Sequence, residues 1–152
     1  MKKRFIKETD VKAREWLDAN FVPKQNIRVA WTENQFDWND ANITSSTDEV
    51  YFMELKVRHV KSTDYSGLTA IEQDKFNTLL KHKGKVALMV MFKDCICWFP
   101  PTKLFDAFAG IGLLHNCPDE THPTTTKEWV LKNKVVGYFD TTKAIKYNYA
   151  SM

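Results

Sequence analysis

Two charged residues interrupt an apolar run that extends from Val50 to Val57. Glu54 and Lys56 are separated by one residue, so on a β-strand their side chains project from the same face. The rest of the run is suited to burial, and a buried charge without compensation costs several kcal/mol. We therefore expect a metal, a partner or a phosphate group at this face, and a metal-bound phosphodiester would compensate both charges.

The composition is that of one folded domain. The chain has 152 residues, of which 43% are apolar and 13% aromatic, enough for one core and too few for two. No apolar run approaches the roughly 20 residues that span a bilayer. The basic start of the chain is not followed by an apolar segment, so we expect no secretory signal, no membrane partner and a cytoplasmic location. We treat residues 1–152 as a single domain.

Local patterns predict a mixture of helices and strands. Amphipathic spacing predicts a helix from Thr9 to about Asn20. Alternating or continuous apolar runs predict strands at 27–31, about 36–44, 50–57, 86–92, 95–99 and 135–139. The first three of these strands follow one another with short connections, so we expect an antiparallel meander.

Two further helices are expected in the second half of the chain. The segment 69–72 reads as a capping box that opens a helix, and Gly84 closes it. Pro100 and Pro101 are expected to start another helix that ends at about Ala109, and residues 110–126 to form an irregular segment. The fold class that follows is α/β, with a mixed central sheet flanked by helices.

A carboxylate on the neighbouring strand would complete a metal site with Glu54. If the hairpin turns near Thr47, Glu54 lies opposite about residue 40, whereas Asp37 is displaced by about 10 Å at roughly 3.3 Å per residue. We therefore prefer Asp40, and Asp37 stays open because the register is uncertain by one residue. Mg²⁺ prefers a few oxygen ligands and retains waters, so two carboxylates suffice as protein ligands, and Lys56 would lie beside the attacking water.

The order of an Asp, a short loop, a Glu-x-Lys strand and a helix resembles the PD-(D/E)XK nuclease superfamily. The likeness covers about Phe36 to Phe108 and is similar to the RecU-type Holliday junction resolvases. In those proteins a glutamine-bearing helix follows the Glu-x-Lys strand, as Gln73 does here. A glycine, an apolar strand and a strand ending at proline come next, as with Gly84 and Pro100. The resemblance implies a restriction-endonuclease-like fold.

The resemblance also implies a function and a set of site residues. Asp40 and Glu54 would bind Mg²⁺, with Mn²⁺ as a substitute, and Lys56 would position or activate the water. Gln73 would support the site from the following helix. The implied activity is metal-dependent hydrolysis of DNA phosphodiester bonds, on branched DNA such as a Holliday junction. Two symmetric cuts across a four-way junction require two sites, which implies a homodimer.

The helical spacing of Gln73 indicates its position independently of the resemblance. It lies on one helical stripe with Phe76 and Leu80, so its amide would point toward the layer that carries Glu54. A buried glutamine that merely caps a strand edge fits the same pattern equally well.

The chain departs from the family pattern in two places. Asn39 precedes Asp40, so the Pro-Asp pair is absent, while the Glu-x-Lys half is intact. Many members also present an acidic residue from the first helix. The candidates here are Asp10, Glu8 and Glu15, although a solvated helix face explains them as well.

Several other interpretations remain open. Asp40, Glu54 and Lys56 could form a cross-strand ion pair on an exposed sheet face. Arg58, on the face of Glu54 and Lys56, could contact a flanking phosphate or form an exposed salt bridge. Small core thiols explain the cysteines better than a zinc site does, and the residues such a site would use are Cys95, Cys97, His115, Cys117 and His122.

The competing functions differ in what they would bind. One alternative is a repair or restriction-type nuclease that acts on linear or flap DNA. Another is a catalytically inactive nuclease-like domain that binds nucleic acid or protein, and a third is a small zinc-bearing interaction domain. The net charge of +3 is compatible with nucleic-acid binding without requiring it.

Overall fold

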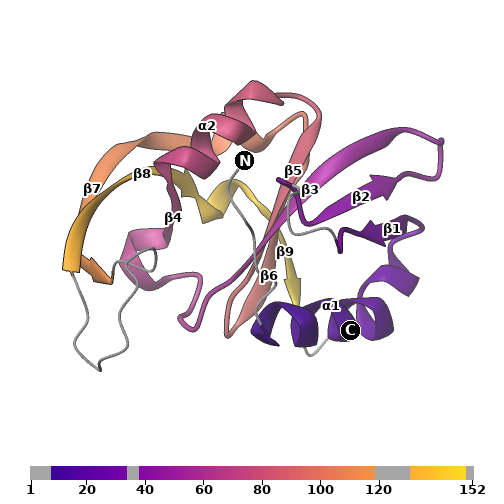
Figure 1. Cartoon of the computed structure of the whole chain (residues 1–152). Helices are drawn as coiled ribbons and strands as arrows, with labels where there is room; N and C mark the ends of the chain where they lie inside the picture. The colour runs from indigo at the N-terminus through magenta and orange to yellow at the C-terminus, as the bar shows by residue number, and fades with distance from the viewer. Residues whose placement is uncertain (1–7, 34–37, 119–130, 150–152) are drawn as a thin grey trace.

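The computed structural model describes residues 8–33, 38–118 and 131–149, which form an α/β fold with two sheets and two α-helices (Figure 1). The helices are α1 (Glu8–Asn20) and α2 (Gln73–Lys81). The six-stranded sheet contains, in spatial order, β1 (Arg28–Trp31), β2 (Ala41–Thr44), β3 (Val50–Val57), β5 (Val86–Met91), β6 (Cys95–Phe99) and β9 (Ile145–Asn148). The smaller sheet contains β4 (Leu68–Glu72), β8 (Leu131–Asp140) and β7 (Phe108–Pro118).

The six-stranded sheet is mixed because one crossover separates two antiparallel parts. β1, β2 and β3 form the predicted antiparallel meander. The chain then passes through β4 and α2 and returns as β5, which pairs with β3 in parallel. β5, β6 and β9 complete the sheet with antiparallel pairs.

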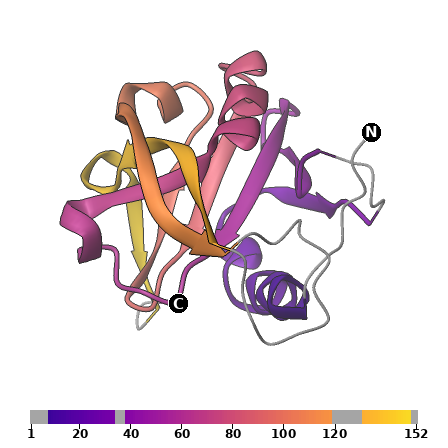
Figure 2. The same ribbon diagram turned by 60° about the vertical axis from the view of Figure 1, so that its left-hand side comes forward.

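The central strand β5 explains why both faces of this sheet are covered. All of its residues are buried, as its continuous apolar run predicts. Val86, Leu88 and Val90 pack in one cluster with residues of α2 and the smaller sheet, whereas Ala87 and Met89 pack in another with residues of α1. Figures 1 and 2 show α1 and α2 on opposite sides of the six-stranded sheet.

The prediction of a helix opening with a capping box at 69–72 is wrong. This segment is strand β4, in which Thr69 and Ile71 are buried and alternate with half-buried neighbours. Its pairing with β8 uses the two-residue period of the segment, and this tertiary contact overrides the local helix signal. Helix α2 begins only at Gln73, without a side-chain cap, and ends at Lys81, before Gly84 turns the chain with φ +83°.

The segment after the two prolines also differs from its prediction. The expected helix is reduced to a short 3₁₀ turn at Leu104–Ala107. Residues 110–118 of the expected irregular segment belong to strand β7, which pairs with β8 through two interruptions of register, and residues 119–126 lie outside the described part of the chain. The sequence did not predict β7 because Gly110 and Gly112 interrupt its apolar run. A sheet can nevertheless accommodate glycine, for example at a bulge.

Other strand boundaries agree more closely with the sequence. β2 begins at Ala41, later than the predicted 36, and residues 34–37 lie outside the described part of the chain. Two tyrosines near the end of the described chain pack against α1 and the residue that follows it, since Tyr149 and Tyr147 make edge-to-face contacts with Trp16 and Phe21. Neither described helix has the length and apolar character needed to cross a membrane.

Candidate active site

The β2–β3 hairpin brings Asp40 and Glu54 to the same end of the pair of strands. The ladder turns near Thr47, as predicted, and stops at the pair of Ala41 and Met53, so Asp40 comes just before the paired residues of β2 and Glu54 just after those of β3. The Asp40 N–H donates to the Met53 carbonyl at 2.9 Å. Asp40 and Glu54 are each only 1% exposed. The predicted register is therefore confirmed to within about one residue, and the alternative of an ion pair on an exposed sheet face is wrong because both carboxylates are buried.

Asp40 is held by α1 and by the neighbouring strand. Arg14 Nη2 donates to Asp40 Oδ1 at 3.0 Å, and the Leu55 N–H donates to Oδ2 at 2.7 Å. The second Arg14 nitrogen, Nη1, donates to the Thr32 carbonyl at 2.8 Å, and the guanidinium lies 5.2 Å from the centre of the Trp31 ring. Asp40 thus links α1, β3 and the segment that follows β1.

Glu54 lies between two lysine side chains. Lys56 Nζ is 3.5 Å from Glu54 Oε1, and Lys75 Nζ is 3.3 Å from Glu54 Oε2. The side chains of Lys56 and Lys75 are 28% and 23% exposed, so both remain partly in contact with solvent although the carboxylate is buried. The predicted proximity of Lys56 to Glu54 is present.

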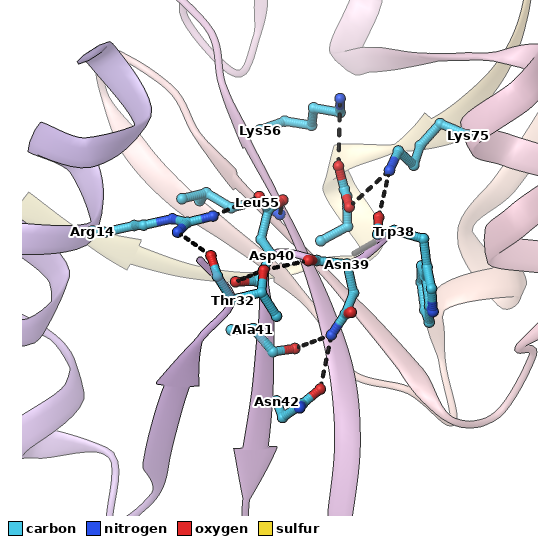
Figure 3. A network of polar contacts seen from close by, with 11 residues as sticks. Arg14, Thr32, Trp38, Asn39, Asp40, Ala41, Asn42, Leu55, Lys56 and Lys75 are labelled. Carbon is cyan, nitrogen blue, oxygen red and sulfur yellow. Dashed lines mark hydrogen bonds and ion pairs between the residues drawn. The ribbon is translucent and has the colours of Figure 1, made fainter. Parts of the chain in front are cut away.

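The two carboxylates face different helices. Figure 3 shows Arg14 entering the cluster from α1, while Lys75 approaches from the opposite side. Glu54 shares its strand face with Phe52, which packs in the α2 cluster, whereas Leu55 packs in the α1 cluster. The site therefore lies at the end of β2, where the pairing with β3 stops and side chains from both helices reach the same pair of strands.

Helix α2 fixes the segment that leads into Asp40. Lys75 Nζ donates to the Trp38 carbonyl at 2.7 Å, and the Trp38 ring stacks on His82 with centroids 4.2 Å apart and planes 7° apart. Phe52 packs edge-on against both rings. The two ends of α2 thus hold the residue that lies two positions before Asp40.

The helix-borne member of the cluster is Lys75, not the predicted Gln73. Gln73 is exposed at the first position of α2, and its side chain makes no hydrogen bond within the described part of the chain. The predicted stripe is also wrong at Leu80, which is 47% exposed, because the buried face of α2 is formed by Phe76 and Leu79. A helix starting at Gln73 rather than at residue 70 changes which side chains face the sheet.

Helix α1 contributes a basic residue, Arg14, where the resemblance to the nucleases implied an acidic one. Sequence reasoning did not select Arg14, although its spacing to Leu17 places it on the buried face of α1. Asp10 is half-buried and Glu15 is exposed on the same helix. The side chain of Glu8 and the whole of Asp37 lie outside the described residues.

Arg58 connects the candidate site to the smaller sheet. Its Nη2 donates to the Ala70 carbonyl in β4 at 2.9 Å, and this hydrogen bond joins the two sheets. Glu54 and Lys56 lie on one face of β3, which ends at Val57, and Arg58 is the next residue of the chain.

The cysteines of β6 behave as core residues. Cys95 and Cys97 are buried, with their sulfur atoms 3.9 Å apart. Burial, followed by the neighbouring Cys95, raises the pKa of the Cys97 thiol to about 12, so that it stays protonated. The other residues considered for zinc, the side chains of His115 and Cys117 and the whole of His122, lie outside the described residues.

The chemistry of Asp40 and Glu54 fits a hard divalent cation. A carboxylate is a hard oxygen ligand, and Asp40 accepts from Arg14 at one oxygen and from Leu55 at the other. Within residues 8–33, 38–118 and 131–149, no three His, Cys, Asp or Glu side chains gather at one point. The protein could therefore supply two carboxylate ligands there, a number compatible with a Mg²⁺ ion that retains several waters.

Comparison with known proteins adds no relative. No family model, no curated protein and no solved structure matches this chain. The functional argument therefore rests on the residues and contacts of the chain itself.

Proposed function

We propose that the protein is a Mg²⁺-dependent endonuclease that hydrolyses phosphodiester bonds in DNA. The observation that carries this proposal is the burial of Asp40 and Glu54 at the same end of two paired strands, with the Lys56 amine 3.5 Å from Glu54. A stable fold rarely buries carboxylates unless cations compensate them. Here the compensating side chains include two partly exposed lysines, which a substrate could engage.

The order of elements around the site supports the same proposal. The Glu-x-Lys strand β3 is followed by β4 and α2, and then by Gly84, by the buried strand β5 and by β6, which ends just before Pro100. Apart from the inserted strand β4, this is the order that the likeness to PD-(D/E)XK nucleases implies. A restriction-endonuclease-like fold is therefore part of the proposal.

Each side chain of the cluster would have a separate task. A Mg²⁺ ion held by Asp40 and Glu54 would polarise a phosphoryl oxygen and lower the pKa of a bound water. Lys56 would orient that water and neutralise charge that accumulates on the phosphate. Hydrolysis forms a bond between the water oxygen and phosphorus and breaks one phosphorus–oxygen ester bond, and the leaving oxygen takes a proton. Arg58, just after the end of β3, would contact a neighbouring phosphate.

One observation favours a second candidate function, a nuclease-like domain that binds nucleic acid without cleaving it. Arg14 already neutralises Asp40 at 3.0 Å, and a guanidinium remains charged at every physiological pH. In this alternative the Arg14 charge replaces a metal ion, and the partly exposed side chains of Lys56 and Lys75 bind phosphate groups.

A cleavage assay with matched variants separates the two functions. We expect Glu54→Gln and Lys56→Ala to lose Mg²⁺- or Mn²⁺-dependent cleavage while DNA binding and Tm change little. Glu49→Gln and Lys85→Ala are the controls, because both residues are exposed and close to the same strands, and these variants should cleave normally. Cleavage at the wild-type rate by Glu54→Gln or Lys56→Ala would remove these residues from the mechanism. Salt-sensitive binding without cleavage by the wild-type protein would favour the second candidate.

The same assay defines the DNA substrate and the oligomeric state. Four-way junction, flap and linear duplex DNA of equal length should be compared at one salt concentration. Our proposal is that branched DNA is cut fastest, by a homodimer that makes two symmetric cuts. Faster cutting of flap or linear DNA would assign the protein to repair or restriction-type nucleases instead.

A further inference from the structure

The ion pairs around Glu54 are loose although the carboxylate is buried. Its separations from Lys56 Nζ and Lys75 Nζ, 3.5 Å and 3.3 Å, exceed the roughly 2.7–2.9 Å of close charge-assisted pairs. Both lysine side chains are partly exposed, so an anion from solvent can approach each of them. These two ion pairs of Glu54 are therefore ones that a substrate could replace.

The charges of the cluster disfavour a free metal ion and favour a phosphate. Arg14, Lys56 and Lys75 carry three positive charges, and Asp40 and Glu54 carry two negative ones, which leaves a net charge of +1. A divalent cation that approaches Glu54 meets the Lys75 ammonium near the same oxygen. A phosphate, in contrast, is attracted to the two partly exposed lysines.

Lys75 has a second contact that keeps its amine in place. Nζ donates to the Trp38 carbonyl at 2.7 Å, which is shorter than its 3.3 Å separation from Glu54. An ammonium group has three donors, so Lys75 can keep Trp38 while a different anion takes the position of Glu54. Lys56, which shares β3 with Glu54, has no such anchor among the contacts described.

We propose that Lys75 holds Glu54 until a nucleic-acid phosphate takes over its ammonium group, so that metal ion and nucleic acid bind this site cooperatively. This inference rests on the proposed function, because it assumes that Glu54 is a metal ligand. Coupling between two ligands is reciprocal, so DNA must raise the affinity for the metal by the factor by which the metal raises the affinity for DNA. Lys75 is a positioning residue in this scheme, since it acts through Glu54.

Titration with Mn²⁺, followed by the paramagnetic resonance signal of the free ion, tests the proposal without an activity readout. The titration is performed with and without a phosphorothioate-substituted duplex, which keeps the backbone charge and resists hydrolysis. For the wild-type protein we expect the duplex to lower the Kd for Mn²⁺ by roughly tenfold. Lys75→Gln should bind Mn²⁺ about tenfold more tightly without DNA, and the effect of the duplex should shrink by a similar factor.

Two further variants control for charge and for position. Lys75→Arg keeps a positive charge beside Glu54 and should retain weak Mn²⁺ binding in the absence of DNA. Lys81→Gln removes an exposed lysine from the last turn of the same helix and should behave like the wild-type protein. A change in Lys81→Gln equal to that in Lys75→Gln would assign the effect to overall charge and overturn the proposal.

The outcomes distinguish this inference from the proposed function. Mn²⁺ binding by the wild-type protein that does not respond to the duplex, or equal Kd values for wild type and Lys75→Gln, would overturn the role of Lys75 alone. The wild-type titration needs no variant and so decides the point even if Lys75→Gln does not fold. If the wild-type protein bound no Mn²⁺ with or without DNA, both the metal-dependent function and this inference would fail.

Discussion

The two sides of the candidate site hold their carboxylates in different ways. On the α1 side, Asp40 accepts from the Arg14 guanidinium at 3.0 Å and from the Leu55 N–H at 2.7 Å, and only 9% of the Arg14 side chain is exposed. On the α2 side, Glu54 is approached at 3.3–3.5 Å by Lys56 and Lys75, which are partly exposed. The α1 side is therefore closed to solvent, whereas the α2 side is open to solvent through the partly exposed side chains of Lys56 and Lys75. We refer to them as the closed side and the open side.

This difference indicates that the surroundings of Asp40 are rigid and that those of Glu54 can exchange partners. The planar guanidinium presents fixed donors, which here bind Asp40 and Thr32 at the same time. A lysine is a point charge on a flexible chain, so Lys75 can turn about its anchor at Trp38. We infer that Asp40 positions β2 against β3, and that Glu54 is the carboxylate whose surroundings change when a ligand binds.

The largest expected effect comes from removing the cation on the closed side. Arg14→Met leaves the buried Asp40 without its guanidinium, so we expect the free energy of unfolding to fall by about 3–5 kcal/mol. Lys75→Gln on the open side should cost only about 1 kcal/mol, because Lys56 still compensates Glu54. Urea denaturation of both variants measures the comparison directly.

A double variant tests the cause of the Arg14 effect. Asp40→Asn removes the negative charge and keeps an oxygen that can accept from Leu55. Arg14→Met combined with Asp40→Asn should therefore recover part of the stability that Arg14→Met loses. If Arg14→Met alone costs less than about 1 kcal/mol, the closed side is not rigid in the sense argued here.

An intermediate effect is expected at Asp94, a carboxylate held by neutral donors. The N–H and the hydroxyl of Ser62 donate to its two oxygens at 2.7 Å and 2.6 Å. Partial burial works against ionisation of Asp94, but the hydrogen bonds from Ser62 outweigh it, and its pKa lies below the ordinary value of 3.8. Asp94→Asn should cost about 1 kcal/mol near neutral pH, a value reduced for the solvent exposure of the group.

The pH dependence of this effect has a definite sign. Because the pKa of Asp94 is lower in the folded protein, its contribution to stability is fully present above pH 3.8 and is lost as pH falls through the folded value. The difference in Tm between wild type and Asp94→Asn should therefore shrink as pH falls from about 5 to about 3. A constant difference would show that the hydrogen bonds do not depend on the charge of Asp94.

The sequence predicted the strands of the site better than the helix beside it. The period of two in β3 and the position of the turn near Thr47 were sufficient to place Asp40 and Glu54 at the same end of the hairpin. The start of α2 was not predictable in this way, because β4 is stabilised by its pairing with β8, far away in the chain. That displaced start is the reason why Lys75 was missed and Gln73 was selected.

The side chains that contact Asp40 and Trp38 could not be predicted without knowing how the two helices pack on the sheet. Arg14 follows Ala13 in a helix that reads as amphipathic, and nothing local shows that its guanidinium meets Asp40 across 26 positions of the chain. The same holds for Lys75 and Trp38, whose contact spans 37 positions. Side chains that join distant segments depend on packing, which a periodicity argument does not describe.

The smallest expected effect belongs to an exposed pair with the same residue types as the closed side of the site. Arg28 Nη2 lies 3.4 Å from Asp48 Oδ1, and the two side chains are 77% and 87% exposed. Arg28→Ala should change the free energy of unfolding by less than about 0.5 kcal/mol, because solvent screens both charges in either state. Arg28 is the better residue to replace, since Asp48 has a φ of +63° and a substitution there would add backbone strain.

A double-mutant cycle for Arg28 and Asp48 should give a coupling energy near zero, and the cycle for Arg14 and Asp40 should give a large one. Equal coupling energies would mean that burial does not decide what an Arg–Asp pair contributes in this protein, and the contrast between the closed and open sides would lose its physical basis.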